Sequence, residues 1–135
     1  TAYTVVLTDV VGGNMAAAGI AVQTITGAAN LGTTAHDVVI INGNLANEAA
    51  AETALKTGGT FQLTLNAGSA AIANNDALLV LYDDGSHSYL AYAKNDSGGN
   101  WAVNTSCSSL DVVNLVTFTG VTDCTSIVAG DLTIV

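Results

Sequence analysis

The sequence contains no proline, no arginine and only two lysines, against eleven acidic residues in 135, which gives a net charge of −9. Two lysines neutralise few phosphates and the negative field repels a polyanion, so nucleic acid is excluded as a partner. The same sign argument excludes binding to an anionic membrane surface. No segment has the roughly 18 consecutive apolar residues that a membrane span requires, so we also expect no membrane insertion.

Charged residues of either sign are scarce, at 10% of the chain, while hydrophobic residues make up 50%. Disordered chains have the opposite balance, so this chain is expected to fold. A chain of this length can bury roughly two-thirds of the surface that its unfolded form exposes, which is enough for one core. We therefore predict a single β-rich domain over residues 1–135.

Most segments alternate with period two, or run as short β-branched stretches, between clusters of Gly, Asn, Asp and Ser. This pattern is typical of strands, and Asp84-Gly85 between two such runs favours a hairpin. The predicted fold class is mostly β: an antiparallel β-sandwich-like domain with one short helix at about 45–57. Strands are predicted at 3–11, 19–26, 37–42, 60–66, 77–82, 88–93, 101–103, 112–119 and 132–135.

The predicted helix is rich in alanine and carries Glu48, Glu52 and Lys56 at four-residue steps. Asn44 is the expected N-cap, and Glu48 lies near the positive end of the helix dipole. Glu52 and Lys56 have the spacing of an i,i+4 ion pair. Gly58 can take the left-handed conformation that ends many helices.

Cysteine is represented only by Cys107 and Cys124, which lack CxxC spacing and histidine neighbours. This argues against zinc and against a thioredoxin-like redox motif. An even pair in an acidic chain rich in Thr and Asn favours an exported protein with one disulfide. Such a bond would stabilise the fold by about 3 kcal/mol. The alternative is two buried free thiols.

Catalytic groups are few, because the only histidines are His36 and His87. His87 has Ser86 and Asp83 beside it, but neighbours in one hairpin do not easily present the geometry of a catalytic triad, and the chain has no GxSxG elbow. No glycine-rich phosphate loop is present. We therefore predict that the protein is not an enzyme and has no organic cofactor.

Calcium is the one ligand for which the sequence offers donors. Asp83 and Asp84 in one turn, and Asp96 in another, supply the carboxylate oxygens that hard cations prefer. Neither turn has the spacing of an EF-hand or of a nonapeptide calcium repeat. Ordinary hydrogen-bonded Asx turns are the alternative.

Three segments carry a family resemblance: the hairpin sequence at 76–92, the VTFTGVT strand at 116–122 and the closing GDLTIV at 130–135. Together they resemble the C-terminal regions of bacterial surface proteins exported by type I secretion, namely RTX-type adhesins and surface-layer proteins. The resemblance implies a secreted, bacterial, cell-surface protein. It also implies a terminal secretion signal, whose matching residues are Asp131, Leu132, Ile134 and Val135.

The sequence thus leads to two functional hypotheses. The first is a non-catalytic extracellular structural protein, a subunit of a surface layer or filament that joins other copies of itself through strand edges. Edge strands are normally guarded by Lys or Pro, which this chain almost lacks. The alternative is a cell-surface adhesin module that binds carbohydrate or protein, with or without calcium. An exposed cluster of Tyr82, Tyr89, Tyr92 and Trp101 would favour that alternative.

Overall fold

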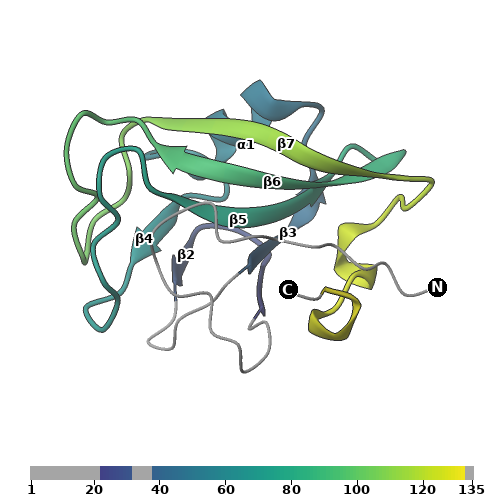
Figure 1. Ribbon diagram of the computed structural model, residues 1–135, viewed down its shortest axis with the longest axis horizontal. Helices are drawn as coiled ribbons and strands as arrows, with labels where there is room; N and C mark the ends of the chain where they lie inside the picture. The colour runs from purple at the N-terminus through teal and green to yellow at the C-terminus, as the bar shows by residue number, and fades with distance from the viewer. Residues whose placement is uncertain (1–21, 32–37, 133–135) are drawn as a thin grey trace.

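The computed structural model describes residues 22–31 and 38–132, and its centre is a five-stranded sheet (Figure 1). The strand order is β1-β3-β5-β6-β7, and two shorter strands, β2 and β4, pair separately. The strands are β1 (Val22–Ile25), β2 (Ala29–Leu31), β3 (Val38–Asn44), β4 (Leu63–Leu65), β5 (Ala77–Asp83), β6 (His87–Asn95) and β7 (Leu110–Thr119). The mostly-β prediction is confirmed.

The sheet is mixed, which corrects the expectation of an antiparallel sandwich. β3 runs parallel to β1 and to β5, whereas β5, β6 and β7 are antiparallel. Parallel neighbours need a crossover connection, and the helix α1 (Glu48–Leu55) lies in the connection between β3 and β5. The four apolar residues of β3 from Val38 to Ile41 are all buried, as is typical of a strand covered on both faces.

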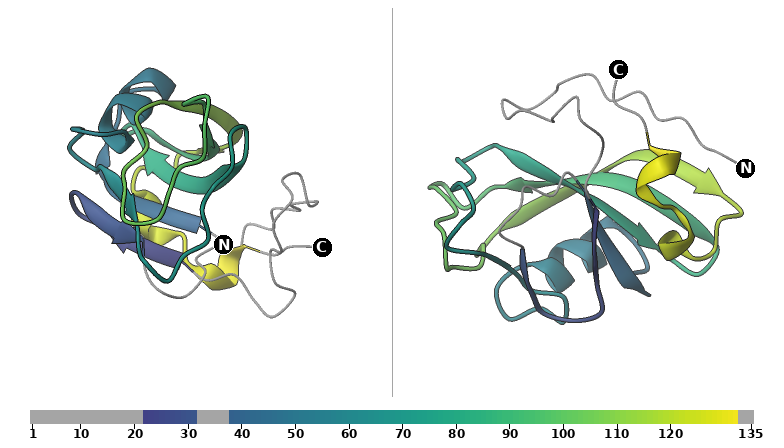
Figure 2. Two further views of the ribbon diagram at one scale, coloured as in Figure 1. Left: turned by 90° about the vertical axis from the view of Figure 1, so that its left-hand side faces the viewer. Right: turned by 90° about the horizontal axis from the view of Figure 1, so that it is seen from below.

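Apolar side chains form one cluster on each face of the sheet. β5 shows the alternation: Val80 and Tyr82 point to the cluster that includes α1, and Leu81 points to the other. We call the first the helix-side core and the second the opposite core. Two 3₁₀ segments, η1 (Cys124–Ser126) and η2 (Ala129–Asp131), cover part of the opposite core. The left view of Figure 2 shows α1 and these segments on opposite sides of the sheet.

The helix is shorter than expected, and its cap differs. Asn47 is the N-cap, and its Oδ1 accepts a hydrogen bond from the Ala50 N–H at 2.9 Å. Asn44 cannot cap the helix because it is the last residue of β3. Lys56 lies past the helix end in an extended conformation, so it is not part of an i,i+4 pair on the helix. Gly58 has φ +82°, which confirms the left-handed position after the helix.

The hairpin of β5 and β6 is confirmed, with Gly85 at φ +84° in its turn. The strand predicted at 101–103 is reduced to a single bridge between Trp101 and Ile72. Leu132 follows η2 and is not in a strand, while the rest of the strand predicted at 132–135 and all of that at 3–11 lie outside the described residues.

The predicted disulfide is wrong, because Cys107 and Cys124 are free thiols buried in different cores. The Cys107 thiol donates to the Ser109 carbonyl at 3.0 Å, and the Cys124 thiol donates to the Ile41 carbonyl at 3.1 Å. The sheet lies between the two sulfurs and prevents a bond. Burial raises the pKa of both thiols, so each stays protonated and unreactive.

Candidate functional site

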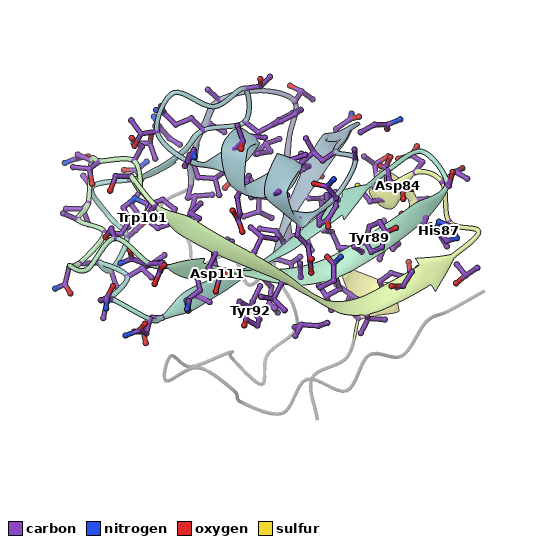
Figure 3. All side chains as sticks on the ribbon, turned by 90° about the horizontal axis from the view of Figure 1, so that it is seen from above. Asp84, His87, Tyr89, Tyr92, Trp101 and Asp111 are labelled. Atoms are coloured by element: carbon purple, nitrogen blue, oxygen red, sulfur yellow. The ribbon has the colours of Figure 1, made fainter. Side chains whose placement is uncertain are left out.

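The two acidic turns predicted to bind calcium lie at opposite ends of β6. Asp83 and Asp84 precede this strand and Asp96 follows it. Nine strand residues span roughly 30 Å. In Figure 3, Asp84 accordingly lies at the far end of the hairpin from Trp101. The three carboxylates therefore cannot share one cation.

Asp83 is 3% exposed, and its carboxylate connects the hairpin turn to η1 through hydrogen bonds. Its Oδ1 accepts a hydrogen bond from the Gly85 N–H at 3.1 Å, and its Oδ2 accepts one from the Cys124 N–H at 3.2 Å. Both carboxylate oxygens are thus used to hold the chain, which matches the Asx-turn alternative.

Asp84 organises the surface of the same turn. Its Oδ1 accepts hydrogen bonds from the Ser86 and His87 N–H groups, both at 2.8 Å, and its Oδ2 accepts one from the Tyr89 hydroxyl at 2.7 Å. These bonds, that from Tyr89 first, lower the pKa of Asp84 to about 2. His87 Nδ1 lies 3.9 Å from Asp84 Oδ1, which is too long for the hydrogen bond of a catalytic His–Asp pair.

Asp96 lies beside a lysine. The Lys94 ammonium is 3.8 Å from Asp96 Oδ1 and 3.1 Å from Asp111 Oδ2. Within 22–31 and 38–132, no group of three or more His, Cys, Asp or Glu residues is arranged to hold a metal ion. Calcium binding at either turn stays a prediction.

The four large aromatic residues do not form an exposed cluster. Tyr82 and Tyr89 stack with ring centroids 5.1 Å apart, but Tyr82 is fully buried. Trp101 is 2% exposed, and its indole N–H donates to the Thr105 carbonyl at 2.8 Å. Figure 3 shows Tyr89 and Trp101 at opposite ends of the sheet.

The outer strand β7 is partly covered by glutamates from α1, which sequence reasoning did not foresee. The Asn114 N–H donates to Glu48 Oε1 at 2.7 Å, and the Val112 N–H donates to Glu52 Oε1 at 3.3 Å. Four helical residues rise about 6 Å, close to the roughly 6.7 Å between alternate strand residues. The four-residue spacing therefore lets the two carboxylates reach alternate residues of one strand, but the spacing does not say which strand that is.

The Tyr82 side chain fixes the same part of the edge from within the sheet. Its hydroxyl donates to Asn114 Oδ1 at 2.8 Å, while the Asn114 N–H bonds to Glu48. Burial is the main cause that raises the pKa of Tyr82, so the hydroxyl stays a donor. The edge at 112–114 is thus held by both the helix and the sheet.

Beyond Asn114 the character of β7 changes. The pairing with β6 shifts register here, so Leu115 has no direct partner on β6. Leu115 is 47% exposed, and Thr117 and Thr119 are exposed as well. The segment 115–119, of sequence LVTFT, has no charged residue, no lysine and no proline. This half of the edge strand therefore lacks the lysine or proline that usually guards against strand addition.

An open hollow of about 480 Å³ lies between the end of β7 and η2, and Asp123 and Asp131 are among its lining residues. Both carboxylates accept backbone hydrogen bonds, from Thr125 and Val128 respectively. Asp131 thus belongs to η2.

The other residues matched to a secretion signal are divided between the core and the undescribed end. Leu132 is 5% exposed in the opposite core. Ile134 and Val135 lie outside the described residues. The secretion-signal assignment stays a prediction from the resemblance.

Comparison with known proteins adds no identification, since no family model, curated protein or solved structure matches the chain. The likeness to type I-secreted surface proteins therefore stays a prediction from the residues quoted above. In the part of the chain that the structure describes, no helix has both the length and the apolar character needed to cross a bilayer.

Proposed function

We propose that the protein is a non-catalytic extracellular structural subunit that self-assembles through strand edges into a surface layer or filament. The observation that carries this proposal is the second half of β7: an outer strand with exposed Leu115 and an uncharged run to Thr119. An outer strand offers backbone donors and acceptors to another strand, and this stretch has no lysine or proline to prevent the pairing.

The adhesin alternative receives less support. That alternative requires an exposed cluster of four aromatic side chains. Two of them, Tyr82 and Trp101, are buried and cannot stack on a sugar. The extracellular location rests on the acidic, lysine-poor composition and on the family resemblance, because the disulfide that favoured export is absent.

The test is the association state of the purified chain, measured by sedimentation velocity and electron microscopy over a range of protein, salt and calcium concentrations. We expect association that increases with salt, because screening weakens the repulsion between copies of charge −9. A monomer under every condition would refute the proposal. Association only in the presence of calcium would instead favour calcium as part of the assembly contact.

A further inference from the structure

We infer that one contact of the assembly pairs β7 with β7 of a second copy, antiparallel and centred on Thr117, and that α1 confines the pairing to this half of the strand. This contact closes a dimer, and a second contact extends the dimers into a layer or filament. This inference rests on the proposed function. It identifies the strand of the second copy that β7 pairs with, and the helix that limits the length of the pairing. Two such sheets would continue into one another as a single sheet across a twofold axis.

The charge distribution selects this stretch for contact with an identical copy. Two copies of charge −9 repel each other, so a self-contact is favoured where the facing strands carry no charge. Residues 115–119 meet this condition, and unlike the uncharged outer strand β1 they include a large exposed apolar side chain, Leu115. Pairing about Thr117 sets Leu115 opposite Thr119 of the second copy, and exposed apolar and β-branched side chains pack well across strands.

The glutamates of α1 explain why the pairing would stop at Asn114. The N–H groups of Asn114 and Val112 already bond to Glu48 and Glu52. An incoming strand cannot bond to these two groups unless it displaces the two glutamate side chains. The helix is held in place by its buried residues Ala51, Ala54 and Leu55, so this cover is part of the folded subunit. Figure 3 shows α1 lying beside β7.

The first experiment blocks the centre of the contact. Thr117→Glu sets two carboxylates opposite each other at the twofold axis, and we expect the dimer dissociation constant to rise at least about tenfold. Asn100→Glu makes the same charge change in an exposed loop beyond the other end of β6 and should leave association unchanged. Equal association of wild type and Thr117→Glu would overturn the inference and leave self-assembly through another edge intact.

The second experiment maps the contact by cross-linking. A short bis-maleimide should join two copies of Thr117→Cys but not of Ser86→Cys, because only position 117 meets its own copy. The native cysteines are buried and do not interfere. Preferential cross-linking at position 86 would contradict the inferred geometry.

The third experiment tests whether the hydrogen bonds from β7 to Glu48 and Glu52 limit the pairing. Glu48→Ala/Glu52→Ala removes both acceptors, whereas Glu48→Gln/Glu52→Gln removes the same charge and keeps an acceptor oxygen on each side chain. We expect the alanine variant to associate roughly tenfold more tightly than the glutamine variant, with Thr117→Glu abolishing the gain. Circular dichroism of both variants checks that they are folded, and the position-117 experiments decide the contact even if the alanine variant does not fold.

The outcomes of the third experiment are distinct. Equal association of the alanine and glutamine variants would overturn the role of the glutamates. A monomeric wild type together with monomeric alanine and glutamine variants, at all salt concentrations, would overturn the proposed function as well as the inference. A wild type that associates independently of position 117 would overturn the inference alone.

Discussion

Asn95, the last residue of β6, is fully buried and holds together three loop segments. Its side-chain amide donates to three backbone carbonyls, and its Oδ1 accepts from a backbone N–H and a hydroxyl. The carbonyls are those of Ile72, Ala73 and Gly99, at 3.0, 3.2 and 2.8 Å, and the donors to Oδ1 are the Ser97 N–H and Ser97 Oγ. The Cys107 thiol, which donates to the closer Ser109 carbonyl, lies 3.3 Å from the same oxygen. We expect Asn95→Ala to be among the most destabilising single substitutions in the chain.

The size of the effect follows from these bonds. Two amide hydrogens and one acceptor oxygen, at about 1 kcal/mol for each bond made, give about 3 kcal/mol. The three carbonyls each keep a second donor, namely the Trp101 N–H, the Asp76 N–H and the Ser97 hydroxyl, so no further penalty is added. A loss of about 3 kcal/mol is a large part of the 5–15 kcal/mol by which typical domains are stable. It corresponds to a melting temperature lower by roughly 10 °C.

The assay is urea unfolding followed by circular dichroism, with Asn100→Ala as the control. Asn100 is exposed, so its substitution should change the free energy of unfolding by less than about 0.5 kcal/mol. Asn95→Asp offers a second check, because a carboxylate facing three carbonyls is unfavourable. Its folded-state pKa should be raised, so its stability should fall as pH rises above about 4. A loss below about 1 kcal/mol for Asn95→Ala would refute this reasoning.

Three further predictions follow from other contacts. Both cysteine thiols should resist a maleimide label in the native protein and react in denaturant, with no mass change on reduction. The carboxyl of Asp84, followed by NMR, should titrate near pH 2, so its stabilising effect is lost as pH falls from about 4 toward 2. Tyr89→Phe should raise this pKa toward 3.8, since the tyrosine hydroxyl is the largest cause of the shift. Gly59→Ala should destabilise the fold by about 1–3 kcal/mol, because its Cβ would overlap the Ala54 carbonyl, whereas Gly99→Ala meets open space and serves as the control in thermal melts.

Local features of the fold were predictable because nearby residues determine them. The hairpin turn at Gly85 and the left-handed position of Gly58 both depend on the backbone freedom of a single glycine. The helix was placed correctly within a few residues, although Asn47 caps it instead of Asn44. Two asparagines three residues apart are equally good caps in sequence, and the end of β3 decided between them.

The strand directions were not predictable from alternation, because period two is the same for parallel and antiparallel pairing. The run from Val38 to Ile41 was the available signal: four consecutive apolar residues indicate a strand buried on both faces. With a helix following, that pattern favours a crossover to a parallel neighbour. The prediction of a disulfide was wrong because the number of cysteines does not say on which face of a sheet each one lies.

The candidate site shows the same division. The sequence by itself determined that the chain is acidic, poor in lysine and proline, and rich in strands, and that 115–119 carries no charge. These properties belong to composition and short segments. Only the tertiary structure decided that β7 is an outer strand of the described sheet, that Glu48 and Glu52 bond to half of its edge, and that Tyr82 and Trp101 are buried instead of exposed. The two glutamate contacts join residues 60 and 66 positions apart, and no local pattern specifies which distant segment packs against which.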